Sequence, residues 1–158
     1  MENVVLRAAV VKDYDAFNMI HSIANDTNAK FAPHVLKHAA ITITLELFQE
    51  QLNSPEIFLY VAQYEEKIVG IISAEIRRAP NLPALISRSY VHVSHLCVSP
   101  EFRRQGIASA LLDACKAWGK AQNAQSMEVM VMDKNENAIR TYENNGMVCL
   151  KRIYEVIL

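Results

Sequence analysis

Two different spacings of apolar residues along the chain predict its strands and its helices. Short runs rich in β-branched and aromatic residues predict strands over 4–9, 57–64, 68–77, 90–98, 127–132 and 147–158. Apolar spacings of three and four predict helices from 13 to about 25–28, then over 45–53, 107–122 and 135–144. The order β-α-α-β-β-β-α-β-α-β predicts one mixed α/β domain over residues 1–158.

The most informative stretch runs from Tyr90 to Lys120. Its apolar strand stops at Ser99-Pro100, and a basic turn containing Gly106 then opens an amphipathic helix. A helix start attracts anions because its first backbone N–H groups are unpaired. Gly106 gives a phosphate close access to the backbone, and Arg103 with Arg104 adds charged donors. The pattern predicts a pyrophosphate site, and a solvated basic turn before a helix is the structural alternative.

Composition narrows the class of ligand. The chain has 158 residues and a formal net charge of −1, which argues against a nucleic-acid partner because such proteins usually carry a basic excess. The two arginines of the turn are therefore a local feature, suited to a small anionic ligand.

The cysteines and the N-terminal residues indicate the cellular compartment in which we expect the protein. The three cysteines fit neither a disulfide framework nor a zinc pattern, so we expect a reducing compartment and no metal. The N-terminal stretch lacks a signal-peptide pattern, and no apolar run approaches about 18 residues. We therefore expect a cytoplasmic protein without a membrane partner.

Two motifs resemble those of the GNAT superfamily, the GCN5-related N-acetyltransferases. Residues 98–108 fit the family's Gln/Arg-x-x-Gly-x-Gly/Ala signature through Arg103, Gly106 and Ala108. Residues 135–147 fit its Asn-x-x-Ala-x-x-x-Tyr-x-x-x-Gly-aromatic run, with Met147 in place of the aromatic residue. The chain is thereby identified as a member of this family, of the bacterial single-domain type. The family commonly ends with two strands, but only residues 147–158 remain here, so the final hairpin is very short or fused into one strand.

The resemblance implies a fold and an activity. The implied fold is a mixed, mostly antiparallel sheet whose fourth and fifth strands splay apart, with helices on both faces. The implied reaction is direct transfer of an acetyl group from acetyl-CoA to a primary amine, either a small molecule or a peptide, in a ternary complex. A CoA-binding sensor without significant turnover is the alternative from another class. A homodimer is a further expectation, by analogy with relatives.

The same resemblance assigns the cofactor contacts. Pantetheine would pair with the backbone of the strand ending at Val98, and the turn and helix start would hold the pyrophosphate. Asn135 would contact the cofactor from the next helix start, although Asn is also a favoured N-cap residue, and Tyr142 would lie near the sulfur. The implied residues of the strand and turn are Leu96, Cys97, Val98, Arg103, Arg104, Gln105, Gly106, Ile107, Ala108 and Ser109.

Two residues are the catalytic candidates. Tyr142 would protonate the departing thiolate, because a phenol of reference pKa about 10 is protonated at neutral pH. His92 would accept the amine proton, because histidine titrates in the useful range. Strand alternation predicts His92, Ser94 and Leu96 on one face of the sheet and His95 on the other. His95 or a chain of bound water remains the competing route for the proton.

The sequence indicates the acceptor pocket less clearly than the cofactor site. The irregular segment 29–42 follows the first helix, where the family shapes its acceptor site, but a surface loop would look similar. The residues expected to line the pocket are His21, Phe31, His34 and Tyr90.

Overall fold

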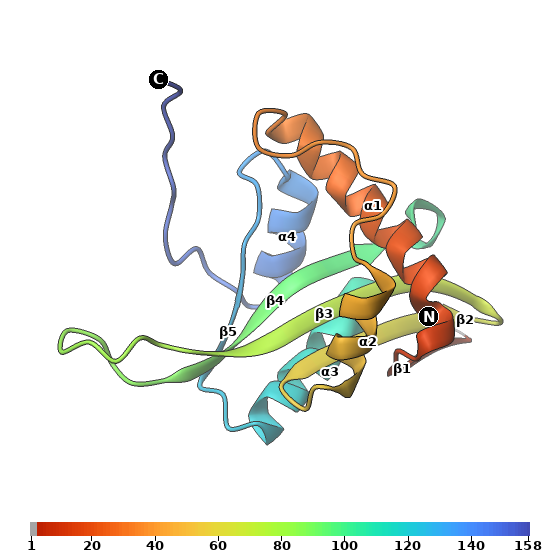
Figure 1. Ribbon diagram of the computed structural model, residues 1–158, viewed down its shortest axis with the longest axis horizontal. Helices are drawn as coiled ribbons and strands as arrows, with labels where there is room; N and C mark the ends of the chain where they lie inside the picture. The colour runs from red at the N-terminus through yellow and green to blue at the C-terminus, as the bar shows by residue number, and fades with distance from the viewer. Residues whose placement is uncertain (1–2) are drawn as a thin grey trace.

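A five-stranded sheet organises the chain in the computed structural model, which describes residues 3–158 (Figure 1). The sheet runs in the order β1-β2-β3-β4-β5, with antiparallel pairing between the first four strands and parallel pairing between the last two. The strands are β1 (Val4–Ala8), β2 (Ile57–Tyr64), β3 (Lys67–Arg78), β4 (Ser89–Val98) and β5 (Ser126–Val129). The expected mixed, mostly antiparallel sheet is confirmed.

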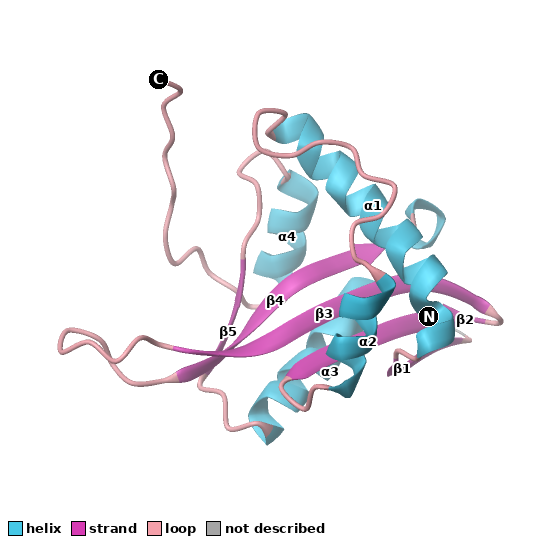
Figure 2. Ribbon diagram, in the orientation of Figure 1, coloured by secondary structure: helices cyan, strands magenta, loops and turns pink. Residues whose placement is uncertain are grey.

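The described chain has four α-helices, two between β1 and β2, one between β4 and β5, and one after β5 (Figure 2). They are α1 (Tyr14–Phe31), α2 (Leu45–Asn53), α3 (Ile107–Ala121) and α4 (Glu136–Asn144). The sequence pattern ended α1 too early, near Asn25 to Asn28, because asparagine favours helix ends. In the structure, the Asn25 amide donates to the Lys37 carbonyl at 2.8 Å, so this side chain holds the following segment instead of ending the helix.

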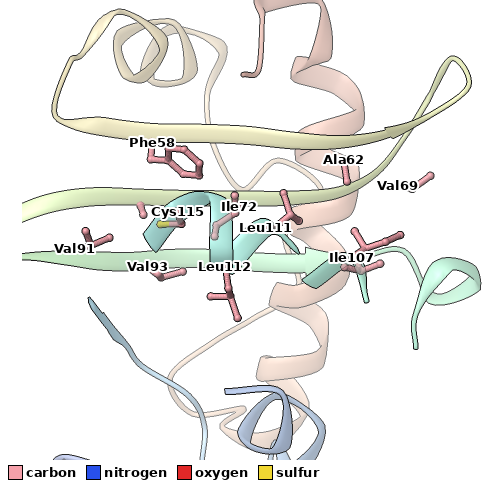
Figure 3. Packing of buried hydrophobic residues seen from close by; sticks show 12 residues of the cluster. Phe58, Ala62, Val69, Ile72, Val91, Val93, Ile107, Leu111, Leu112 and Cys115 are labelled. Carbon is pink, nitrogen blue, oxygen red and sulfur yellow. The ribbon is translucent and has the colours of Figure 1, made fainter. Parts of the chain in front are cut away.

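The helices cover both faces of the sheet. Phe17 and Ile20 of α1 and Phe48 of α2 pack on one face, against residues such as Val61 and Ile71. On the other face, α3 packs Ile107, Leu111, Leu112 and Cys115 against β2, β3 and β4 (Figure 3). The expected placement of helices on both faces is therefore confirmed.

The irregular segment between α1 and α2 is held by one buried side chain. Asn18 of α1 is buried, and its Oδ1 accepts hydrogen bonds from the Thr42 backbone and hydroxyl, both at 2.9 Å. Its Nδ2 donates to the Ala40 carbonyl at 2.9 Å. Because every polar group of this amide has a partner, its burial is compatible with stability, and the segment keeps a defined course without regular structure.

The end of the chain differs from the sequence prediction. Residues 147–158, predicted as a strand, form no strand and run as an extended, exposed segment beyond α4. High β-propensity alone does not make a strand, because the backbone also needs a neighbouring edge to pair with. Separately, no helix in the described range combines the length and apolarity that crossing a bilayer requires.

We predict that Leu111→Ala lowers the free energy of unfolding by about 2–5 kcal/mol, because Leu111 is fully buried and its loss leaves a cavity. Leu82→Ala makes the same chemical change in the β3–β4 loop, where the side chain is 56% exposed, and we expect a change within about 0.5 kcal/mol. Urea denaturation followed by circular dichroism measures both. Equal losses in the two variants would contradict the assignment of the α3 core.

Candidate active site

The strand β4 has two halves with different neighbours. From Tyr90 to Val93 it pairs with β3 on one side and with β5 on the other. From residue 94 to 98 it keeps β3, but within residues 3–158 no strand pairs with its other edge. Figure 1 shows β5 leaving β4 at this point, with α4 beside the opening. The expected splay of the fourth and fifth strands is therefore present.

A β-bulge lies where the two halves meet. Ser73 of β3 faces His95 and Ala74 faces Val93, which leaves Ser94 as an extra, exposed residue in β4. A bulge bends the strand and increases its local twist. The bend therefore coincides with the point at which β5 separates from β4.

The open edge of β4 presents backbone groups to solvent. Ser99 N–H donates to the Val69 carbonyl at 2.9 Å, which places residue 99 in a hydrogen-bonded pair with β3. Because antiparallel residues alternate in the direction of their backbone groups, the N–H groups of Leu96 and Val98 point away from β3. The Val98 carbonyl follows the same alternation and accepts from Arg103 Nε at 2.9 Å. This edge can accept an extended ligand as it would accept another strand.

The turn after β4 is shaped by two left-handed residues. Arg104 has φ 64° and Gly106 has φ 81°, and Gly106 is the N-cap residue of α3. The N–H groups of residues 106–109 have no hydrogen-bond partner in the described part of the chain. These unpaired donors at a helix start fit a diphosphate anion.

Close packing fixes the position of this helix start. A Cβ atom on Gly70 of β3 would lie 3.2 Å from Ile107 Cγ2 and 3.4 Å from Leu111 Cδ1. Glycine at position 70 therefore lets the first turn of α3 approach the sheet. The turn is also tied to β4 through the Arg103 contact with Val98, a use of this arginine that the sequence did not indicate. Arg104, Gln105 and Gly106 are exposed, whereas Ile107 is buried in the core.

Tyr142 of α4 lies beside the open half of β4. Its ring packs against the α3-side core. Burial, with a smaller effect from neighbouring Cys97, raises the pKa of Tyr142 to about 12. The phenol therefore keeps its proton at neutral pH and can donate a hydrogen bond.

The start and end of α4 have their own polar contacts. The Asn135 side chain accepts from the Ala138 N–H at 3.3 Å, so this residue caps the helix as the structural alternative predicted. Asn145 Nδ2 donates to the Ser109 hydroxyl at 3.0 Å, which connects α4 to the first turn of α3. Nothing in the sequence indicates this second link, because it depends on how two distant helices dock.

The prediction for the histidine faces is wrong. Leu96 and Val98 share the α3 side with Val91 and Val93, while Cys97 lies on the α1 side. The extra residue at Ser94 shifts the alternation by one, so His95 joins His92 on the α1 face. The adjacent polar pair Ser94-His95 within an apolar strand is the signal that could have revealed the bulge.

His92 lies between two carboxylates. In register it faces Glu75 of β3 and Glu128 of β5, and its side chain is buried. Burial and the positive charge of Arg77 lower the pKa of His92 below its ordinary 6.5, and the two carboxylates oppose this shift. The imidazole is therefore neutral at neutral pH, with acidic groups placed to favour its protonated form.

His95 and His21 lie in close contact with each other, and both are weaker bases than an ordinary histidine. Their ring centroids lie 3.7 Å apart at an interplanar angle of 81°, and His21 Nδ1 is buried without a hydrogen-bond partner in the range described. Burial, with the neighbouring histidines, lowers the pKa of His95 to about 3, and burial lowers that of His21 to about 4. A general base works best with a pKa near the working pH, so His92 is the stronger candidate.

The other predicted acceptor residues do not gather at one point. His34 contacts Glu155 near the end of the chain, with 2.6 Å between Nε2 and Oε2. Tyr90 lies at the beginning of β4 under the Arg88 guanidinium, five residues before His95 and on the paired half of the strand. Phe31 is the last residue of α1. Of the four residues expected to line the acceptor pocket, only His21 contacts another candidate side chain, that of His95.

Comparisons with known proteins agree with this geometry. A sequence model described as the acetyltransferase (GNAT) family matches residues 19–147. The L-amino acid N-acetyltransferase AaaT of Escherichia coli is 28% identical over 152 residues, covering 92% of this chain and 83% of the relative. An N-alpha-acetyltransferase of Sulfurisphaera tokodaii is 33% identical over 104 residues, covering 63% of this chain and 61% of the relative.

A solved structure extends the similarity to the whole fold. The tetramutant of the BH1408 protein from Bacillus halodurans superposes with a TM-score of 0.91 at 28% identity, covering 98% of this chain and 99% of that one. The family match spans far more than half of the chain, and it includes the turn at Gly106 and the α4 residues up to Met147. The chain belongs to the acetyltransferase (GNAT) family of acetyl-CoA-dependent N-acetyltransferases.

Proposed function

We propose that this protein transfers the acetyl group of acetyl-CoA directly to a primary amine while both molecules are bound. The observation that carries the proposal is the open half of β4, which lies beside the unpaired N–H groups at the start of α3. An extended chain of amides that ends in a diphosphate matches these two features in the same order, with the amides at the open edge of β4 and the diphosphate at the start of α3. Acetyl-CoA supplies the acetyl group in activated form, as a thioester.

The backbone provides most of the proposed cofactor contacts. Leu96 and Val98 would offer N–H groups to the amides of the pantetheine arm, with Cys97 between them facing the other side of the sheet. Residues 103–109 would hold the diphosphate, with the N–H groups from Gly106 to Ser109 as donors. Asn135 would add a contact from the start of α4 while capping the helix.

Tyr142 would act on the leaving sulfur as a hydrogen-bond donor. A free thiol has a pKa of about 8.5, so complete proton transfer from a phenol at about 12 is uphill by about 5 kcal/mol. Donation of a hydrogen bond has no such cost and still stabilises the developing negative charge. We therefore assign Tyr142 the role of stabilising the thiolate, with the final proton coming from either this phenol or solvent.

His92 would accept the proton that the amine must lose. Its lowered pKa keeps the imidazole unprotonated at neutral pH, and Glu75 with Glu128 would stabilise the charge that it gains. His95 lies on the same face and is the competing acceptor, but its pKa of about 3 makes it a weak base.

For the acceptor we propose the α-amino group of an amino acid or peptide. Support comes from the printed names of two relatives, one an L-amino acid N-acetyltransferase and the other an N-alpha-acetyltransferase. The test is release of free thiol from acetyl-CoA with a free amino acid, a short peptide, N-α-blocked lysine, a polyamine and an aminoglycoside. We expect the first two to react fastest. Tight binding of acetyl-CoA without thiol release for any amine would instead support the sensor alternative.

We predict that Gly106→Val weakens acetyl-CoA binding at least about tenfold, because a β-branched residue is strained at φ 81° and crowds the proposed phosphate site. Gly146→Val is the matched control, since Gly146 has φ 79° and no atom within 4 Å of an added Cβ. Thermal-shift titration with acetyl-CoA measures both variants. Unchanged binding in Gly106→Val, or an equal loss in both, would contradict the proposed phosphate contact.

We predict that Tyr142→Phe lowers kcat by about 10- to 100-fold, at or below the lower end of the range of about 100- to 10,000-fold for general acid–base groups, with little change in acetyl-CoA affinity. Tyr60→Phe serves as the control, because Tyr60 stacks on Phe58 in β2 and its hydroxyl has no described partner. Steady-state thiol release gives kcat and KM for each. A change confined to KM would show that Tyr142 binds the cofactor instead of acting on the sulfur.

We predict an acid limb in the pH profile of kcat, with its midpoint below 6.5, because the base must be unprotonated and the pKa of His92 is lowered. Activity should therefore fall only as the pH drops through this lowered pKa. His92→Gln should remove the limb and reduce kcat, whereas His38→Gln, at an exposed position, should leave both unchanged. Loss of the limb in His95→Gln, with His92→Gln fully active, would transfer the role to His95.

A further inference from the structure

A pocket of about 440 Å³ lies at the loop between β3 and β4, which spans residues 79–88. The loop extends beyond the sheet from the end at which β5 pairs with β4 (Figure 1). A pocket of this volume is large enough to hold a small molecule or part of one. Most of its lining is apolar and comes from Ala79, Pro80, Ala84, Leu85 and Ile86. Such a lining favours an apolar occupant, because burial there removes apolar surface from water.

Backbone hydrogen bonds give this loop a defined course. At its base, the Ala79 N–H donates to the Arg88 carbonyl at 2.8 Å. At its tip, the Leu85 N–H donates to the Leu82 carbonyl at 3.0 Å. The pocket is therefore formed by a folded loop rather than by an irregular excursion of the chain.

Tyr90 connects the pocket to the candidate base. It lines the pocket and lies two positions before His92 in β4. Val91 and Val93 pack on the α3 side of the sheet, so Tyr90 and His92 both lie on the opposite face. A strand rises about 3.3 Å per residue, which places the two Cα atoms about 6–7 Å apart. The pocket therefore begins within one side-chain length of the imidazole that we propose accepts the amine proton.

Arg88 is the other polar residue of the lining, and its charge is already paired. Its guanidinium lies 4.6 Å from the centroid of the Tyr90 ring. It also donates to the Ser126 hydroxyl and to Glu128 Oε1, both at 2.6 Å. Glu128 faces His92 in the register of β4 and β5. Because these contacts occupy the guanidinium, the wall of the pocket does not favour an anionic occupant.

We propose that this pocket holds the side chain of the acceptor, and that the protein selects amines whose α-carbon carries an apolar side chain of the size of leucine or larger. The inference rests on the proposed acetyl transfer and deepens it by naming the acceptor's side chain. With the amine at His92, a long side chain directed along β4 passes Tyr90 and enters the pocket. A methyl group is too short to reach it, so alanine gains nothing from this burial.

The kinetic test compares leucinamide with alaninamide in the thiol-release assay. We expect kcat/KM to be at least about tenfold higher for leucinamide, since burying extra methylene groups in an apolar pocket discriminates by about this factor or more. Leu85→Asp places a charge in the lining and should bring leucinamide down to the rate of alaninamide. An unchanged rate with alaninamide shows that the variant is folded and active.

Leu82→Asp is the matched control. It makes the same change in the same loop, and its side chain is 56% exposed against 48% for Leu85, but it does not line the pocket. The preference for leucinamide should persist in this variant. Equal kcat/KM for the two amides in the unaltered protein, or an equal loss of preference in both variants, would overturn the pocket assignment and leave the proposed reaction standing.

A binding measurement separates the pocket from the reaction. With CoA present in place of acetyl-CoA, leucinamide should shift the amide NMR signals of residues 79–90, and alaninamide should shift them far less. Leu85→Asp should abolish these shifts, and Leu82→Asp should retain them. Absence of thiol release with every amine would refute acetyl transfer, whereas these shifts would still support the pocket. Leucinamide that leaves residues 79–90 unshifted, or that shifts them equally in Leu85→Asp, would overturn the proposal whether or not the enzyme turns over.

Discussion

The candidate site depends on a strand that is paired along only half of one edge. β4 needs β3 to hold it in the sheet, but it must leave the other edge unpaired after Val93 for an extended ligand to bind there. Unpaired strand edges normally attract other strands. Here the bulge at Ser94 bends β4 at the point where β5 diverges, and α4 brings Tyr142 beside the opening. The unpaired backbone of β4 thus forms one stretch, beside Tyr142, the side chain that we propose acts on the ligand.

The same bulge determines which side chains share the site. By shifting the alternation it brings His92, His95 and, through contact with α1, His21 to one face, opposite the α3 core. Burial lowers the pKa of all three imidazoles, so the histidines carry little positive charge at neutral pH, and the nearby Arg77 and Arg88 are paired with Glu75 and Glu128. Two further arginines, Arg103 and Arg104, lie exposed in the turn after β4. This separation suits a reaction with an anionic carrier at one end and an amine at the other.

The parts of the structure that could be predicted from the sequence are those with local causes. The turn around Gly106 and the cap at Asn135 follow from backbone geometry and were readable from single residues. The sheet order and the two helical faces followed from the period of apolar positions together with the resemblance. The histidine faces could not be assigned because one inserted residue reverses the pattern beyond it. The link from Asn145 to Ser109 and the absence of strand pairing in residues 147–158 depend on tertiary docking, for which a single sequence has no periodic signal.

The site and the proposed reaction both require that the backbone from Leu96 to Ser109 binds acetyl-CoA. A crystal structure of the protein with this cofactor would test this binding mode. We expect hydrogen bonds from the pantetheine amides to the backbone of Leu96 and Val98, and the diphosphate against the N–H groups of residues 106–109. A complex in which β5 closes onto the second half of β4, or in which the diphosphate lies away from Gly106, would contradict it.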